Sequence, residues 1–143
     1  MKTYEQFYIN GEWVDPVDGK NMFDVLNPSN EEVIAQIAMG TSKDVDKAVK
    51  AASDAFETFS QTTVEERLAL LGKIVEVYQT RYDELAETIS TEMGAPLSLS
   101  KAAQAATGLG HFAQAIEILQ SFEWEETRGK TVLRREPIGV VGM

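Results

Sequence analysis

The spacing of apolar residues changes near residue 41, and this change limits the possible folds more than any other feature of the sequence. Before it, short apolar runs are separated by Asn, Asp, Gly and Pro, which is typical of strands joined by turns. From there to about residue 122, apolar residues recur at steps of three and four, which is typical of amphipathic helices. The sequence therefore predicts an α/β fold in which strands flank a three-helix layer.

The strand region contains one strong turn signal. Asn10 and Gly11 separate the runs 7–9 and 12–14, and both residues tolerate the positive φ of a tight hairpin turn. Two further apolar stretches, 22–26 and 33–39, follow. We therefore expect a hairpin and then two more strands.

Three helices are expected after the strands. The first begins at Thr41, with Asp44 in its first turn, and runs to residue 59. The second is predicted as one helix over 64–93, with Thr62 and Glu65 as a capping box, so it would be about 45 Å long. A helix of this length borders another body, because a small domain cannot cover it.

The second helix should end at Gly94, which suits a left-handed cap. A third helix is predicted from about residue 98 to residue 122, with Ser98 as its cap. The alternating residues of 123–135 then predict a hairpin. Residues 137–143 have no polar side chain, which is typical of a strand buried on both faces of a parallel sheet. We expect a chain with such a run to be part of a longer protein.

Composition excludes several kinds of chemistry. The chain has no Cys and one His, so it lacks a disulfide framework, a thiolate nucleophile and a His-pair metal site. Its 13 Lys and Arg against 23 Asp and Glu give a formal net charge of −10, which argues against nucleic acid as a partner. No basic block or long apolar run points to a membrane. We expect a cytoplasmic protein.

Gly108, Gly110 and Ala113 match the G-x-G-x-x-A form of a dinucleotide-binding loop. That loop needs a strand before its first glycine, and here the preceding alanines continue a helix. The pattern therefore favours a close contact between helices over a cofactor site.

Ser98 and Lys101 fit the S-x-x-K pattern of a serine nucleophile activated by lysine, and His111 is the one histidine. A small hydrolase built on these residues is a third-ranked hypothesis, because the partner motifs of that chemistry are missing. A helix cap explains Ser98 better, and a core or interface position explains His111 better.

Five segments together resemble the amino-terminal part of aldehyde dehydrogenases. They occur in that family's order and with its spacing over nearly the whole chain; Ala95 departs from the family, which usually has lysine there. The segments are FYINGEW at 7–13, LNPSNEEVIAQIAMGTSKDVDKAVKAASDAF at 26–56, ERLALLGKI at 66–74, ETISTEMGAP at 87–96 and REPIGVVGM at 135–143.

The resemblance implies a function for the whole protein. Family enzymes oxidise an aldehyde to a carboxylic acid with NAD or NADP, using a cysteine nucleophile, a glutamate and an asparagine from segments that this chain does not contain. Residues 1–143 would then be the amino-terminal portion of a cofactor-binding domain, without the catalytic domain. No catalytic or cofactor-binding residue is assigned to this chain, and we expect it to be inactive alone.

The resemblance also implies an oligomer and a cation site. Residues 123–135 correspond to part of the arm through which family subunits associate as homo-oligomers. Val25 and Leu26, through their carbonyls, and Glu92, through its carboxylate, correspond to ligands of a monovalent cation, for which oxygen ligands are suitable. Those relatives take a further ligand from beyond residue 143. The plainer alternative is that Glu92 only occupies the last turn of a helix.

A second function from another class remains open. The apolar stripe over 64–89 and the apolar run 137–143 would also suit a non-enzymatic helical module, from a truncated gene, that binds partner chains.

Overall fold

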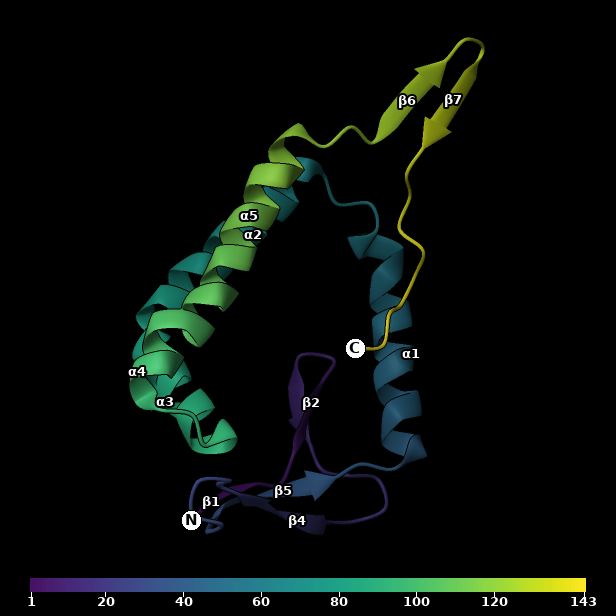
Figure 1. The fold of residues 1–143 in the computed structure, drawn as a ribbon. Helices are drawn as coiled ribbons and strands as arrows, with labels where there is room; N and C mark the ends of the chain where they lie inside the picture. Colours follow the sequence, from purple (N-terminus) through teal and green to yellow (C-terminus); the bar gives the residue numbers. More distant parts are fainter.

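The computed structural model describes residues 1–143, in which the long helices lie between a sheet at one end and the hairpin of the last two strands at the other (Figure 1). The strands are β1 (Lys2–Tyr4), β2 (Phe7–Ile9), β3 (Glu12–Val14), β4 (Asn21–Leu26), β5 (Val33–Met39), β6 (Glu125–Arg128) and β7 (Thr131–Arg134). The helices are α1 (Ser42–Phe59), α2 (Val64–Thr80), α3 (Tyr82–Met93), α4 (Leu97–Leu99), the π-helix η1 (Ser100–Gln104) and α5 (Ala105–Ser121). Strands thus lie at both ends of a helical layer, as the sequence predicts.

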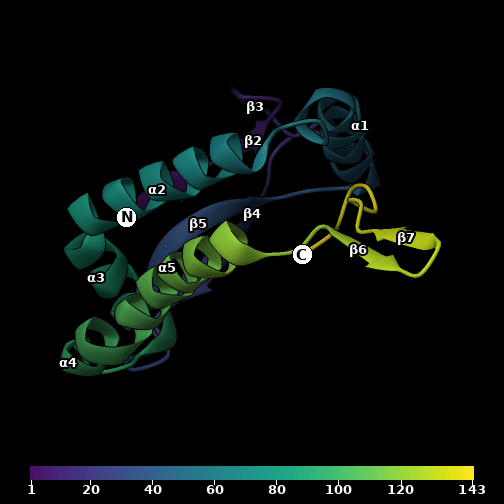
Figure 2. The same ribbon diagram turned by 90° about the horizontal axis from the view of Figure 1, so that it is seen from above.

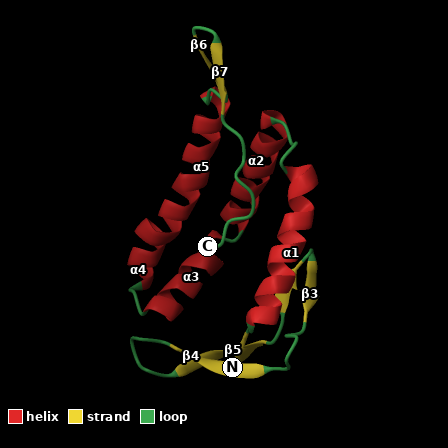
Figure 3. Ribbon diagram, turned by 90° about the vertical axis from the view of Figure 1, so that its right-hand side faces the viewer, coloured by secondary structure: helices red, strands yellow, loops and turns green.

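The strands form three separate sheets. β5 is the central strand of the largest one, with β1 parallel to it on one side and β4 antiparallel on the other. β2 and β3 form the predicted hairpin, and its turn residues Asn10 and Gly11 have φ values of 55° and 80°. The turn prediction is therefore confirmed. β6 and β7 form the second hairpin, which projects from the helices (Figure 3).

The N-termini of the first two helices differ in how well the sequence predicts them. Thr41 and Asp44 form the capping box of α1, as expected. The predicted box at Thr62 is wrong by one residue, because Thr63 and Glu66 cap α2. Thr62 instead donates its hydroxyl to the carbonyl of Phe59 at 2.7 Å and so closes the end of α1.

The prediction of one helix over residues 64–93 is wrong. The backbone leaves the helical conformation at Arg81, where φ is −109° and ψ is 13°, and this separates α2 from α3. Arg81 binds Glu84 through two hydrogen bonds of 2.8 and 2.7 Å, which stabilise the first turn of α3. Gly94 ends α3 in the left-handed conformation, as predicted.

The third helix begins earlier than predicted and contains a wide turn. Pro96, not Ser98, occupies the N-cap position, and Ser98 lies inside α4. In η1 the backbone hydrogen bonds widen to the π pattern, which often marks a functional element. Tyr82 donates its hydroxyl to the carbonyl of Lys101 at 2.5 Å, and Tyr78 to that of Ala105 at 2.8 Å. Two tyrosines therefore hold the wide turn from the neighbouring helices.

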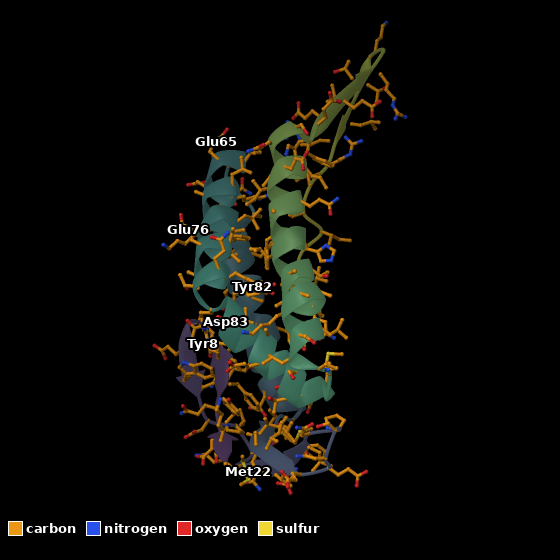
Figure 4. All side chains as sticks on the ribbon, turned by 60° about the vertical axis from the view of Figure 1, so that its left-hand side comes forward. Tyr8, Met22, Glu65, Glu76, Tyr82 and Asp83 are labelled. Carbon is orange, nitrogen blue, oxygen red and sulfur yellow. The ribbon has the colours of Figure 1, made fainter.

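α2, α3 and α5 pack into one layer, and α5 lies beside α2 (Figure 2). Small residues occupy the closest contacts, since Ala86, Ala105 and Ser100 are fully buried. In Figure 4, Tyr82 lies on the side of α3 that faces this packing, whereas Glu76 points outward from α2. The polar faces of the helices are therefore exposed, as their periodicity predicts.

The core of the chain is small. Only eight of 143 residues are buried, five of them hydrophobic: Ile9, Ala35, Ala38, Ala86 and Ala105. The chain exposes 10705 Å², about 3,400 Å² more than the about 7,300 Å² typical of a folded monomer of this mass. The helices and sheets thus present much surface that the chain itself does not cover.

Residues 137–143 do not form the predicted strand. They make no backbone hydrogen bond, and the side chain of Ile138 is 95% exposed. A strand needs a neighbouring strand for its backbone hydrogen bonds, and the other strands of this chain pair among themselves. None of the helices is both long and apolar enough to cross a membrane.

Candidate functional site

The two segments of the predicted cation site meet where α3 ends on the turn after β4. Gly94 packs directly on this turn, because a Cβ atom at Gly94 would lie 2.9 Å from the backbone nitrogen of Ser29 and 3.4 Å from the carbonyl carbon of Pro28. The turn is ordered by Asn27, whose side-chain oxygen accepts hydrogen bonds from the backbone and hydroxyl of Ser29 at 2.9 and 2.8 Å. Glycine is thus needed at residue 94 both for its φ of 70° and for this contact.

A cavity of about 570 Å³ lies beside this junction, between the largest sheet and α3. Its lining includes Val25 from β4 and Glu92 from α3, so the fold brings these two predicted site residues to one place. Leu26 does not line the cavity, and its side chain is half exposed. The remaining lining residues are Met1, Lys2, Tyr4, Ile34, Ala35, Ile37, Glu84, Glu87, Thr88 and Thr91.

The strand pairing is irregular where the predicted carbonyl ligands lie. Val25 pairs with Ala35 and Leu26 pairs with Val33, so Ile34 has no partner of its own in β4. Such a bulge interrupts the ladder of backbone hydrogen bonds. The residue that this bulge leaves without a partner is Ile34 of β5, which also lines the cavity, so the bulge lies opposite Val25 and Leu26.

The carboxylates around the cavity differ in their partners. Glu84 is bound by Arg81, and the hydrogen bond between them, followed by their charge attraction, lowers the pKa of the Glu84 carboxyl. Glu92 makes no side-chain hydrogen bond and no ion pair. No group of three or more His, Asp or Glu side chains is placed to hold a metal ion. A cation here would therefore depend on backbone carbonyls together with Glu92.

Gly108 confirms the interpretation of its motif as a helix contact. It lies inside α5 with helix before it, and a Cβ atom there would meet the hydroxyl of Tyr78 and lie 3.1 Å from its Cζ. Gly110 has no atom within 4 Å of the equivalent position. Gly108, Gly110 and Ala113 all lie within α5, so this motif has neither the loop nor the preceding strand of a dinucleotide-binding fingerprint.

The residues of the third-ranked hydrolase hypothesis are not arranged for catalysis. The ammonium of Lys101 binds Asp83 at 2.8 Å, and this hydrogen bond raises the pKa of Lys101. A lysine that activates a serine must release its proton, so this pairing opposes the role. Ser98 is exposed, and His111 is also exposed on α5, which contradicts a core position for it in this chain.

Asp44 is a structural carboxylate that the sequence reveals only in part. Besides the expected hydrogen bond from Thr41, at 2.8 Å, it accepts one of 2.9 Å from the backbone of Val17. These backbone hydrogen bonds lower the pKa of the buried Asp44 carboxyl. Aspartate in a first helical turn indicates the cap, but nothing local indicates the partner 27 residues away.

Comparison with known proteins identifies the family. The aldehyde dehydrogenase family model matches residues 13–143. A protein of Staphylococcus haemolyticus named as an aldehyde dehydrogenase is 47% identical over all 143 residues. The aldehyde dehydrogenase of Bartonella henselae has a TM-score of 0.89 at 40% identity, with 94% of this chain and 29% of that chain covered. Aldehyde dehydrogenase C of Pseudomonas syringae, in complex with NAD⁺ and octanal, has a TM-score of 0.90 at 40% identity, with coverages of 94% and 27%.

The chain therefore belongs to the aldehyde dehydrogenase family, and its fold is part of that family's fold. It spans about 30% of the length of the curated relatives that it matches. The predicted family and fold class are confirmed. The cation ligands and the role of residues 123–135 stay predictions.

Proposed function

We propose that this chain is the amino-terminal portion of an NAD(P)-dependent aldehyde dehydrogenase that oxidises an aldehyde to a carboxylic acid. The family match over 13–143 carries this proposal. The similar structure of Pseudomonas syringae that contains NAD⁺ and octanal supports the cofactor and substrate classes.

The chain contributes structure rather than chemistry to this reaction. Aldehyde oxidation through a thioester needs a nucleophile and a cofactor pocket, and this chain has no Cys and no dinucleotide loop. Its own residues build a helical layer, held together at Tyr78 and Tyr82, and a junction at Gly94 between that layer and a sheet. We infer that the isolated chain is inactive.

The test compares two proteins in one assay. The first is the 143-residue chain, and the second is this chain joined to the remaining part of the Staphylococcus haemolyticus relative. With octanal and either NAD⁺ or NADP⁺, we expect the absorbance at 340 nm to rise only for the joined protein. Turnover by the chain alone would contradict its inactivity. A folded joined protein that oxidises no aldehyde would contradict the proposed reaction.

We also propose that the carbonyls of Val25 and Leu26 and the carboxylate of Glu92 bind a monovalent cation in the joined protein. The shared cavity and the bulge of β5 opposite Val25 and Leu26 support this site. Potassium or sodium should raise the unfolding temperature above that in tetramethylammonium at equal ionic strength. Glu92→Gln should remove this difference, whereas Glu57→Gln, at an exposed residue of α1, should keep it. Equal unfolding temperatures with all three cations would refute the site.

The hairpin of β6 and β7 is proposed to be part of an arm through which subunits form a homo-oligomer. It projects from the helices, and it exposes the apolar side chains of Val132 and Leu133. In the joined protein, changing both residues to Asp should reduce the oligomer mass measured by sedimentation. An unchanged mass would contradict the arm.

The excess of about 3,400 Å² over the surface typical of a folded monomer also favours the alternative of a non-enzymatic interaction module. A module of that kind should form a defined oligomer as the isolated 143-residue chain. Sedimentation distinguishes the two functions, because a monomeric or aggregating chain would contradict the module.

A further inference from the structure

We propose that Arg135 is a positioning residue, which sets the direction of the β6 and β7 hairpin relative to α5 and thereby favours the association of subunits. The inference rests on the proposed function for the role of the hairpin as part of an arm. It goes further in naming the residue that orients the arm. Arg135 lies outside both strands and apart from the exposed apolar residues Val132 and Leu133.

The hairpin needs such a residue because its own bonds do not reach the helices. β6 and β7 pair with each other and with no other strand. The ion pairs of their side chains also stay within the hairpin and its flanks, such as the pair of Arg134 and Glu125 at 2.7 Å. The linker of residues 122–124, which connects α5 to β6, therefore decides where the hairpin points (Figure 3).

Arg135 follows β7 and binds this linker in three ways. Its backbone N–H donates to the carbonyl of Trp124 at 2.9 Å, and its Nη1 donates to the carbonyl of Glu123 at 3.0 Å. The guanidinium also lies over the ring of Phe122, 5.7 Å from the ring centroid, which is within the range of a cation–π contact. A guanidinium can do both, because it donates in its plane and stacks through its face. Arg135 thus contacts every residue of the linker.

The ring of Trp124 reports on this arrangement. It packs edge-on against Phe122, with 4.7 Å between the ring centroids, so Phe122 contacts both Trp124 and Arg135. The indole N–H of Trp124 is buried without a hydrogen-bond acceptor. A buried donor without an acceptor is unfavourable, so the packing of the rings is what keeps this N–H from water. Removal of the Arg135 side chain should therefore let water reach the indole.

The first measurement is subunit association of the joined protein, followed by sedimentation over a range of concentrations. Arg135→Ala should weaken association by about tenfold or more, because the hydrogen bond to Glu123 and the cation–π contact are both lost. Arg135→Lys should lie between this variant and the unchanged protein, because lysine keeps a charged donor but has no planar face.

Arg134→Ala is the matched control. Arg134 lies beside Arg135 and binds Glu125 at 2.7 Å and Glu136 at 3.8 Å, but it contacts no linker residue. Arg135 also has a distant carboxylate partner, Glu126 at 3.8 Å, so the control removes ion pairs of the hairpin as well. Exposed ion pairs contribute little, so Arg134→Ala should change association by about twofold or less.

The second measurement is the fluorescence of Trp124 in the 143-residue chain. The chain has two tryptophans, so Trp13→Phe leaves Trp124 as the reporter. In this background Arg135→Ala should shift the emission maximum to longer wavelength, because the indole becomes hydrated, and Arg134→Ala should leave it unchanged. Circular dichroism at 222 nm should be the same in both variants, because neither arginine makes a hydrogen bond or ion pair with a helix.

The positioning role and the arm can fail separately. If changing Val132 and Leu133 to Asp lowers the oligomer mass but Arg135→Ala associates as tightly as Arg134→Ala, the arm stands and the positioning role is overturned. If only Arg135→Ala weakens association, the positioning role stands and the proposed arm surface is wrong. If no variant changes association, both are wrong. An emission maximum of Trp124 that Arg135→Ala leaves unchanged also overturns the positioning role, because the linker is then held without Arg135.

Discussion

Gly108 offers the sharpest test of how the helical layer is held together. In this layer α5 approaches α2 at Gly108, and the ring and hydroxyl of Tyr78 fill the space that a side chain would need. We predict that Gly108→Ala destabilises the chain, although alanine favours helix more than glycine does. Gly110→Ala is the matched control, because Gly110 lies in the same helix with no atom within 4 Å of an added Cβ.

The expected magnitude follows from opposing contributions. Replacing glycine by alanine in a helix stabilises by about 0.5–1 kcal/mol. Crowding a packed contact costs about 1–3 kcal/mol, and loss of the hydrogen bond from Tyr78 to Ala105 costs about 0.5–1.5 kcal/mol more. Gly108→Ala should therefore lower the free energy of unfolding by about 2 kcal/mol, and Gly110→Ala should raise it by about 0.5–1 kcal/mol.

The assay is urea unfolding of the 143-residue chain, followed by circular dichroism at 222 nm. Tyr78→Phe in the Gly108→Ala background removes the hydroxyl that the new methyl group meets first and leaves Cζ at 3.1 Å. The two substitutions should therefore cost less together than the sum of their separate effects, by about 1 kcal/mol. The reasoning would be refuted if Gly108→Ala were as stable as Gly110→Ala, or if the double substitution were fully additive.

Two further predictions concern the sheets and their junctions. Hydrogen bonds from the backbone of Thr41 and Val17 hold the pKa of Asp44 below its ordinary value of 3.8, so its stabilising effect is present above that pH and is lost as the pH falls through the lowered pKa. Thermal unfolding between pH 5 and pH 2 should thus depend less on pH in Asp44→Asn; an unchanged pH dependence would contradict the role. Gly94→Ala should destabilise by about 1–3 kcal/mol more than Gly19→Ala, because both have positive φ but only Gly94 contacts backbone; equal urea midpoints would exclude that contact.

Features set by local hydrogen bonds could be predicted from the sequence. The Asn10-Gly11 turn, the Thr41 cap and the left-handed Gly94 each depend on residues within a few positions of one another. Their conformational preferences are properties of the residues themselves, so tertiary packing reinforces rather than replaces them.

Features set by distant partners could not be predicted in this way. The wide turn of η1 depends on the hydroxyls of Tyr78 and Tyr82, which come from other helices, and no local pattern specifies it. The break at Arg81 has no signal in the sequence, because the apolar stripe continues across it. Residues 137–143 show the opposite case, in which a strand-like pattern forms no strand without a sheet to join.

The candidate site depends both on a local conformational preference, that of Gly94, and on contacts between residues distant in the sequence. Val25 and Glu92 line one cavity only because Gly94 lets the end of α3 rest on the turn at Ser29. The residue between Glu92 and Gly94 is Met93, whose sulfur accepts a hydrogen bond from Gln104 at 3.4 Å. The end of α3 is thus fixed on one side by the sheet and on the other by the π-helix.

This double attachment connects the cavity to the helical layer. Gln104 also accepts a hydrogen bond of 2.9 Å from the fully buried Ser100, and the same π-helix is held by Tyr82. A change that loosens the π-helix should therefore reach Glu92 through the end of α3, even though no residue of the π-helix lines the cavity. The glycine substitutions at residues 94 and 108 measure how strongly the contacts of the α3 end and of the helical layer stabilise the chain.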